Sequence, residues 1–294
     1  MKQILVMMAA VVLVGCSKDT PEISQAAEAE AQVTPAPTPE PESAPPSDEK
    51  LIADTIVEKA IRRSLKKPEG GLTEADLEKV TKLSLSETQI TDAGLKEVTK
   101  LQNLTHLYLR GTKITNAGLK EVAKLQELKW LFLSRTQITD SGLKDLAKLQ
   151  HLTILNLSIT QITDVGLKEV TKLQKLEGLF LQYTQITDDG IKDVAKLQRL
   201  EQLFLFNTKV TDDGLKNLTN LQNLTYLHLN NTQITDEGLK EVAKLLKLHH
   251  LSLSNKEITD SGLKDVAKLQ NLKSLSLATS KITDAGLKEV AKLQ

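Results

Sequence analysis

Residues 107–130 read LYLRGTKITNAGLKEVAKLQELKW, and this 24-residue pattern recurs along most of the chain without insertion or deletion. A fixed period of this length is typical of solenoid proteins, in which each repeat packs only against its neighbours. We therefore expect one continuous core running through all the units. Eight units are complete and the ninth stops after 20 residues; they begin at Leu83, Leu107, Leu131, Leu155, Leu179, Leu203, Leu227, Leu251 and Leu275.

The first half of each unit predicts a short strand followed by an inward turn. Leu107 and Leu109 alternate with residues that would face outward, which is the period-2 pattern of a strand. Thr112 and its equivalents would turn the chain inward, with each hydroxyl bonded to the backbone of the neighbouring turn. Lys256 and Ser280 replace this threonine, so we expect the ladder to weaken in the last two units.

The second half of each unit predicts a short helix whose core residues are Leu119, Val122 and Leu125 in the second repeat. Thr115-Asn116 and Thr139-Asp140 look like helix N-caps, and the aspartate column is interpreted as N-capping in preference to a calcium site. Lysines and acidic residues alternate on the remaining face, which predicts a charge-balanced, solvated convex surface in preference to a polyanion site.

The unit LxxLxLxxTxITDxGLKxVxKLQx identifies the chain as a leucine-rich-repeat protein, and its TDxGL segment most resembles the ribonuclease-inhibitor-like subclass. That subclass carries Cys or Asn where this chain carries Thr. The resemblance implies an α/β leucine-rich-repeat solenoid, or horseshoe, over residues 83–294. Its parallel strands would line the concave face and its short helices the convex face.

Residues 49–82 predict a helical cap at the N-terminal end of the array. Apolar residues from Leu51 to Leu65 recur at near-helical spacing and predict a helix over 50–66, which Pro68 and two glycines end. Thr73 would N-cap a second helix that buries Leu72, Leu77 and Val80. The stretch EKAIRRSLKKPEGGLTEADLEKVTKLSLS resembles the N-terminal cap of bacterial internalin-like proteins, and a repeat array needs such a cover over its apolar end.

Residues 1–15 predict an export signal, with Lys2 preceding an apolar run. The run ends in Leu13-Val14-Gly15-Cys16, which resembles the bacterial lipobox; Cys16 is the chain's single cysteine. The resemblance implies cleavage before Cys16 and acylation of that residue, hence a lipoprotein anchored in the cell envelope. Ser17 favours the outer membrane over the inner one under the enterobacterial sorting rule. Residues 16–48, which hold seven of the eight prolines, predict a disordered linker.

Composition argues against several classes of function. Thirty-eight basic and 38 acidic side chains give zero formal charge, which argues against nucleic-acid binding. One cysteine excludes an internal disulfide framework, and no histidine spacing or nucleophile motif indicates a metal site, a cofactor site or an enzyme.

Aromatic residues are scarce, at 3% of the chain, and all of them lie just before, between or after the two strand leucines of their repeats. High strand propensity explains aromatic residues on strands but not their outward position or their clustering in units two to seven. We therefore predict a ligand-binding surface on the concave face. Its candidate residues are Tyr108, Arg110, Trp130, Phe132, Phe180, Tyr183, Phe204, Phe206, Tyr226 and His228.

These features predict a non-catalytic binding module with a protein partner, and they leave a glycan open because aromatic and amide side chains suit both. The alternative is a structural protein that self-associates. In the last unit, Leu287, Val290 and Leu293 would leave an apolar end that no polar cap covers.

Overall fold

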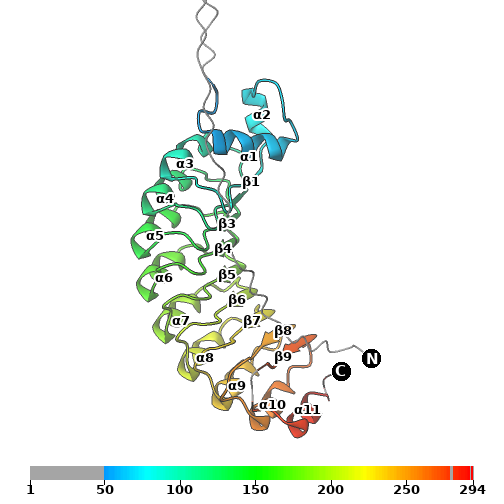
Figure 1. Cartoon of the computed structure of the whole chain (residues 1–294). Helices are drawn as coiled ribbons and strands as arrows, with labels where there is room; N and C mark the ends of the chain where they lie inside the picture. The colour runs from blue at the N-terminus through cyan, green and yellow to red at the C-terminus, as the bar shows by residue number, and fades with distance from the viewer. Residues whose placement is uncertain (1–49, 279–280, 292, 294) are drawn as a thin grey trace, which may run out of the picture. The chain divides into compact units, whose positions relative to one another are not determined.

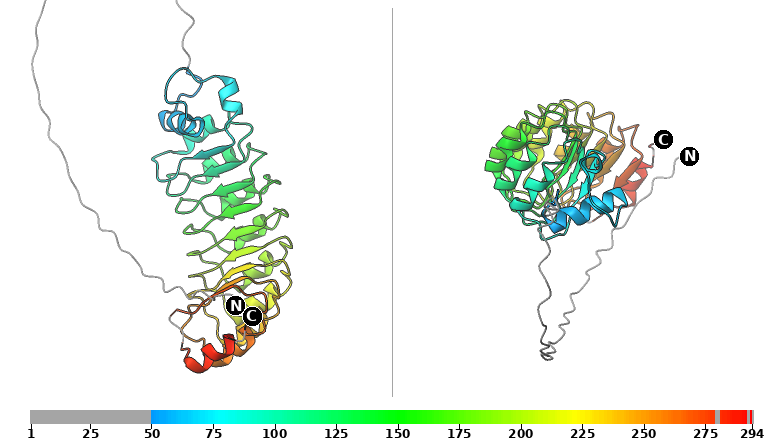
Figure 2. Two further views of the ribbon diagram at one scale, coloured as in Figure 1. Left: turned by 90° about the vertical axis from the view of Figure 1, so that its right-hand side faces the viewer. Right: turned by 90° about the horizontal axis from the view of Figure 1, so that it is seen from above.

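Nine parallel strands form one sheet in strictly sequential order, β1 to β9. The computed structural model describes residues 50–278, 281–291 and 293. Strands line the inner side of a curved array and helices the outer side (Figure 1). Seen from the inner side, the strands lie one after another along the array (Figure 2). The strands are β1 (Lys82–Ser84), β2 (His106–Tyr108), β3 (Trp130–Phe132), β4 (Ile154–Asn156), β5 (Gly178–Phe180), β6 (Gln202–Phe204), β7 (Tyr226–His228), β8 (His250–Ser252) and β9 (Ser274–Ser276).

One helix of seven residues follows each strand and packs against the helices of the adjacent repeats. None of the helices in the described ranges is long and apolar enough to cross a membrane. The helices of the array are α3 (Asp92–Val98), α4 (Asn116–Val122), α5 (Asp140–Leu146), α6 (Asp164–Val170), α7 (Asp188–Val194), α8 (Asp212–Leu218), α9 (Asp236–Val242), α10 (Asp260–Val266) and α11 (Asp284–Val290).

The strand register aligns each consensus leucine with the same leucine of the next repeat, as Leu83 aligns with Leu107 and Leu107 with Leu131. Leu107, Leu109 and Leu119 are completely buried, as the sequence predicts. The large side chains of the core among the described residues are all aliphatic, and none is aromatic. The expected leucine-rich-repeat solenoid is confirmed, with parallel strands inside the curve and helices outside.

Two helices, α1 (Thr55–Leu65) and α2 (Glu74–Glu78), precede β1. The first is shorter than the expected 50–66, because Asp54 caps it by accepting hydrogen bonds from the backbone N–H groups of Ile56 and Val57. Val57 and Ile61 are its completely buried residues, whereas Ile56 and Leu65 are only partly buried. Thr73 caps α2 as expected.

The threonine column is satisfied locally and not, as expected, by the neighbouring turn. The Thr112 hydroxyl donates to the backbone carbonyl of Leu109, three residues earlier, at 2.7 Å. The same bond recurs from Thr88 to Thr232. In repeat eight the buried Asn255 compensates for the loss of threonine, since its side chain donates to the Leu229 carbonyl at 2.9 Å. Ser280 lies outside the described residues.

The aspartate column links consecutive repeats, so the N-capping interpretation is wrong in part. Asp92 accepts from the backbone N–H of Thr115 at 2.8 Å and from its hydroxyl at 2.5 Å. Thr115 is the N-cap, because its oxygen also accepts from the backbone N–H of Ala117. We call this arrangement the Asp–Thr ladder. It comprises Asp92–Thr115, Asp140–Thr163, Asp164–Thr187, Asp188–Thr211, Asp212–Thr235, Asp236–Thr259 and Asp260–Thr283.

Two local variations show what the ladder requires. A Cβ atom at Gly118 would overlap the Asp92 carboxylate, so the glycine leaves room for the rung. Asn116 replaces aspartate in the second repeat and donates from Nδ2 to the Thr139 hydroxyl at 2.8 Å. The Thr139 side chain then makes no capping hydrogen bond to α5, because its hydroxyl accepts the hydrogen bond from Asn116 instead.

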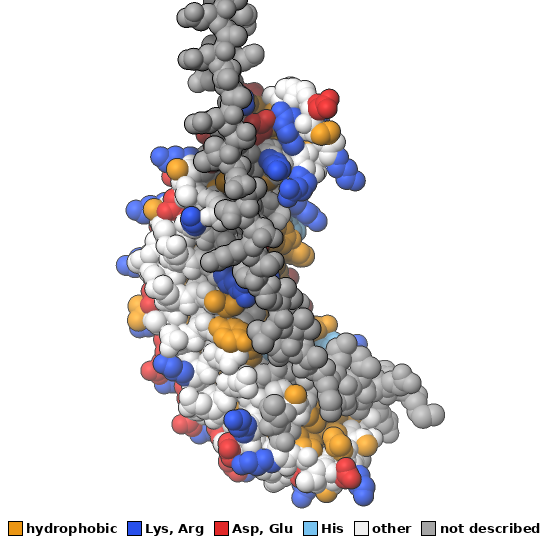
Figure 3. All heavy atoms as spheres, viewed as in Figure 1, with side chains coloured by type: hydrophobic (Ala, Val, Ile, Leu, Met, Phe, Trp, Pro, Cys, Tyr) orange, Lys and Arg blue, Asp and Glu red, His pale blue; other side chains and the backbone are white. Residues whose placement is uncertain are grey.

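The outer face is covered by charged residues in alternation, as Figure 3 shows along the helix side. Lys124 pairs with Glu121 at 2.7 Å and Lys148 with Asp145 at 2.8 Å, and five more repeats carry the same pair. Each exposed pair contributes little stability, on the order of 0.3–0.5 kcal/mol. These pairs are the charge-balanced, solvated convex surface that the sequence predicts.

Adjacent aspartates in α7 offer a matched test of the ladder. Asp188→Ala removes two hydrogen bonds to Thr211 of the next repeat and should lower the free energy of unfolding by roughly 1–3 kcal/mol. Asp189→Ala removes only the exposed pair with Lys192 and should leave unfolding almost unchanged. Urea denaturation of the full chain measures both. Equal effects of the two substitutions would show that the ladder adds no stability.

Candidate binding surface

Three residues of each repeat face the concave side: one before the first strand leucine, one between the two leucines and one after the second. We call these the first, second and third concave rows. His106, Tyr108 and Arg110 occupy them in the second repeat. The structure therefore places the sequence-predicted residues on one face, although Tyr183 follows the third row by one position.

The rings of the second row stack on one another along the array. Adjacent strands lie about 4.8 Å apart, which is also a suitable spacing for stacked rings. Tyr108 stacks on Phe132 with a ring-centroid distance of 4.9 Å. Phe204 lies between Phe180 at 4.4 Å and His228 at 4.2 Å, so both of its faces are covered.

The first row contains two further ring pairs. The His106 ring meets Trp130 edge to face at 4.5 Å, and Tyr226 stacks on His250 at 4.1 Å with an interplanar angle of 8°. The aromatic residues thus form two groups, one on β2 and β3 and one on β5 to β8. Ile154, Asn156 and Gly178 lie between the groups, where the first and second rows lack aromatic rings.

Every aromatic ring in the described range lies outside the buried core. Trp130 is 39% exposed, and the other rings of the first two rows are half-buried against one another. Arg110 is exposed and pairs with Glu87 through Nε and Oε1 at 3.3 Å. The predicted surface is thus accessible, but much of its ring area is already used in ring–ring contacts.

A row of residues with left-handed backbone follows the third concave row, and we call it the rim row. Gly, Asn, Glu and Arg occupy most of its positions, whereas Ile159 and Tyr183 occupy it in repeats four and five with φ of 55° and 57°. A left-handed conformation costs a residue with a Cβ atom roughly 1–2 kcal/mol, and a β-branched side chain is a genuine outlier there. Ile159 is nevertheless 41% exposed and Tyr183 52% exposed.

Two other features set repeat five apart. The side-chain oxygen of Gln182 is buried and has no hydrogen-bond partner within the part of the chain that the structure describes. Gly178 is the first residue of β5, and a Cβ atom there would overlap the Ile154 side chain, so the glycine leaves room for it. Gln182 and Ile159 are not among the ten binding residues that the sequence predicts, although both follow the strand leucines. The sequence does indicate a left-handed backbone in this row, because glycine and asparagine, which favour that conformation, occupy several of its other positions.

Burial among the stacked rings lowers the pKa of His228 below its ordinary value of 6.5, and the neighbouring His250 lowers it further. Burial also lowers the pKa of His250, with His249 and Lys273 adding to the effect. At neutral pH both imidazoles are therefore neutral stacking partners, His228 for Phe204 and His250 for Tyr226.

Comparison with known proteins agrees with this geometry. The profile of the leucine-rich repeat region family matches residues 136–294, and a second leucine-rich repeat profile matches residues 77–98 and 100–123. The chain belongs to the leucine-rich repeat family. Internalin C2 of Listeria monocytogenes is 30% identical with a TM-score of 0.63, and the match covers 78% of this chain and 95% of that one.

A leucine-rich-repeat protein of Leptospira interrogans is also similar, with 28% identity and a TM-score of 0.57. That match covers 75% of this chain and 55% of the Leptospira protein, so the chain spans about half of its length. Among curated proteins no sequence matches significantly. Leucine-rich-repeat proteins of this kind are generally non-enzymatic scaffolds for protein interaction.

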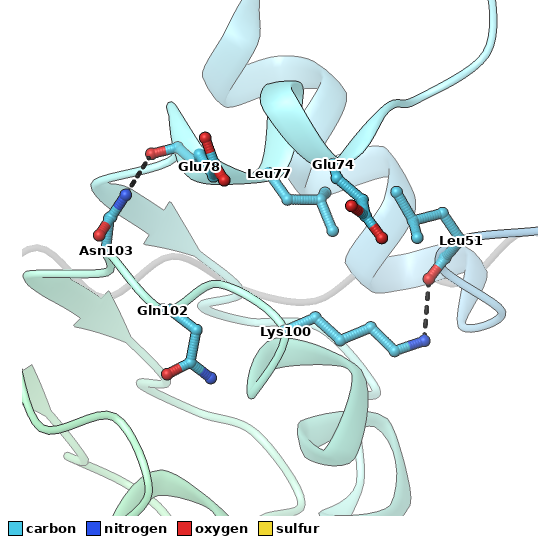
Figure 4. A pocket seen from close by; sticks show the side chains of 7 residues that line it. All are labelled: Leu51, Glu74, Leu77, Glu78, Lys100, Gln102 and Asn103. Carbon is cyan, nitrogen blue, oxygen red and sulfur yellow. Dashed lines mark hydrogen bonds between the residues drawn. The ribbon is translucent and has the colours of Figure 1, made fainter.

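The described residues contain no cluster of side chains that could hold a metal ion. One pocket lies between the cap helices and the first repeat of this leucine-rich-repeat protein (Figure 4). Lys100 donates to the Leu51 carbonyl at 2.8 Å across it, and Asn103 donates to the Glu78 carbonyl at 2.9 Å. These bonds join the cap to the array. The residues that line the pocket therefore have a structural role, and we assign no ligand to it.

The last described repeat exposes less apolar surface than the sequence suggested. Val290 and Leu293 are buried, whereas Leu287 is 45% exposed although its equivalents, such as Leu263, are completely buried. Cys16, the export signal and the linker lie outside the described residues.

Because the pKa of His228 is lowered in the folded protein, we predict that the stability of the protein decreases in acid. Below pH 6.5 the unfolded state binds a proton at this site more readily than the folded state, so stability falls as the pH decreases. His228→Phe keeps a ring for the stack and removes the titration, so its melting temperature should fall less than that of the wild type between pH 7 and 5. His151→Phe, at an exposed histidine, is the control. Identical pH profiles for all three proteins would contradict the prediction.

Proposed function

We propose that this leucine-rich-repeat protein is a binding module that recognises a protein partner through its concave face, displayed on a bacterial envelope by a lipid on Cys16. The observation that carries the proposal is the separation of roles within each repeat. Leucine, isoleucine and valine fill the core completely, so the aromatic side chains contribute nothing to it. They gather on the accessible concave rows, and aromatic residues are enriched at the centres of protein interfaces.

The stacked arrangement favours a protein partner over a glycan. A sugar ring packs against the open face of an aromatic ring, whereas in the second row the faces of Phe180, Phe204 and His228 are turned toward each other. Such a ladder presents ring edges, which pack well against aliphatic and aromatic side chains of another protein. Its rings are also held in place before binding, which reduces the entropy lost on association.

The envelope location rests on the lipobox-like segment before Cys16 and on the proline-rich residues that follow it. Several acyl chains on one residue give stable anchoring, whereas a single chain gives marginal attachment. Residues 17–48 would then hold the repeat array away from the membrane surface. The outer membrane is the proposed location because Ser17 follows the cysteine.

Truncation of the second row tests the concave face. The double variant Phe180→Leu, Phe204→Leu keeps apolar bulk but removes the ring edges, and it should lose proteins that the wild-type full chain captures by crosslinking from an envelope extract. The matched control is the convex double variant Lys120→Ala, Lys144→Ala, which should capture the same proteins as the wild type. Because each aromatic pair contributes about 0.5–1.5 kcal/mol, melting temperature is measured in parallel.

Unchanged capture with a lowered melting temperature would assign the rings a structural role. The same preparations test self-association as the alternative function. Sedimentation velocity should show one species at all concentrations, and oligomers that disappear on Leu287→Glu would favour the exposed end of the array as the functional surface.

Lipidation has its own test. Expression of the full chain in a bacterial host with radiolabelled palmitate should label the protein and place it in the membrane fraction, because acylation requires the Cys16 sulfur. Cys16→Ser should abolish both the label and the membrane association, whereas Ser17→Ala should leave them unchanged. Label retained in Cys16→Ser would refute the proposed anchor.

A further inference from the structure

Three departures from the repeat pattern meet at the junction of repeats four and five. Ile159 and Tyr183 are strongly exposed although their backbones are left-handed, and the oxygen of Gln182 beside them is buried without a partner within the described chain. None of the three adds to the core. Residues that cost stability in an otherwise regular array are characteristic of functional positions.

We propose that this part of the rim row anchors the partner contact and that it receives an apolar side chain from an acidic protein segment. The proposal rests on the function proposed above and places its strongest contact at the edge of the concave face. The occupant is a segment of another protein. The chain's own acidic stretch, residues 40–49, contains only alanine and proline as apolar residues, with no leucine, isoleucine, valine or aromatic residue.

The apolar part of the anchor is already positioned. Tyr183 meets Phe206 edge to face at a centroid distance of 5.0 Å, which fixes the ring while half of the residue stays exposed. Ile159 occupies the same position in the preceding repeat, and its backbone N–H donates to the backbone carbonyl of Gln182 at 2.9 Å. The two side chains therefore stand about one strand spacing apart and form a short apolar surface.

The charges around this surface favour an acidic partner. Across repeats two to seven, the rim row and the exposed position after each column threonine contain Lys113, Arg135 and Lys209 and no acidic residue. Arg135 is the rim residue next to Ile159, because its backbone N–H donates to the Ser158 carbonyl. Asp189 and Asp213, exposed acids at the starts of α7 and α8, are paired with lysines of their own helices at 2.7 and 2.5 Å.

An arginine beside an apolar anchor suits a carboxylate next to a leucine or phenylalanine, since arginine forms paired hydrogen bonds with carboxylates. Arginine and tyrosine are also the residues that most often dominate protein interfaces. The left-handed Ile159 completes the set, because a residue chosen for stability alone at that position would be glycine or asparagine.

The test uses the wild-type full chain as bait for a phage-displayed library of random 12-residue peptides. We expect the enriched peptides to combine Asp or Glu with one Leu or Phe. Their affinity, measured by fluorescence anisotropy of the synthetic peptides, should fall about tenfold on Ile159→Asn and weaken further with added salt. Arg135→Gln should lower the affinity and reduce its salt dependence.

Stability separates this role from a structural one. Ile159→Asn relieves the left-handed strain, so its melting temperature should equal or exceed that of the wild type while binding is lost. Asn231→Ala, at a rim position outside the anchor, should retain binding. A parallel loss of melting temperature and binding in Ile159→Asn would overturn the proposal.

The concave variant Phe180→Leu, Phe204→Leu distinguishes the two proposals. If the peptides bind Ile159→Asn but no longer bind this double variant, the rim anchor is overturned and binding by the concave face is retained as the function. Peptides lost only on Ile159→Asn would support the anchor and move the binding surface from the concave rows to the rim. Peptides that lack acidic residues, or the recovery of none, would overturn the anchor.

Discussion

The Asp–Thr ladder is the constraint on which the repeat geometry depends. Each rung joins the start of one helix to the N-cap of the next, with the carboxylate accepting both the backbone N–H and the hydroxyl of one threonine. The threonine oxygen at the same time accepts a backbone N–H of its own helix, so a single hydroxyl closes the cap and the contact between repeats. An insertion in one repeat would move the carboxylate away from its threonine, which accounts for the strict period of 24 residues.

A fixed repeat offset has a direct consequence on the opposite face. Because every strand begins at the same place in its repeat, equivalent side chains form straight rows at the strand spacing. Rings placed in such a row stack without any rearrangement, as Phe180, Phe204 and His228 do. The ladder and the aliphatic core hold the array, and the identity of the concave side chains is therefore not fixed by the core.

Much of the fold follows from the sequence because a solenoid encodes long-range contacts in its period. The pairing of Leu83 with Leu107 is implied by the repeat itself, and burial of Leu119 follows from helical spacing. The role of Asp92 could not be obtained in this way, since Thr-Asp at a helix start suits a cap and a link to the next repeat equally well. The start of α1 at Thr55 was missed for a similar reason: hydrophobic spacing continues upstream, but Asp54 caps the helix there.

The position of the candidate surface could be predicted from the sequence, but the stacking of its rings and the backbone conformation of its rim could not. Alternation placed Tyr108 and Phe132 on the concave side, yet the stacking that covers their faces depends on side-chain rotamers. The backbone of Ile159 was hidden because its residue type argues against a left-handed conformation.

The structure shows why that strain is tolerated. In a repeat array each unit contacts only its neighbours, so a local penalty is not transmitted along the chain. The rungs Asp140–Thr163 and Asp164–Thr187 remain intact on either side of Ile159, and its repeat keeps its full aliphatic core. An exposed apolar side chain at the rim therefore costs stability in one unit without disturbing the register that positions the other rows.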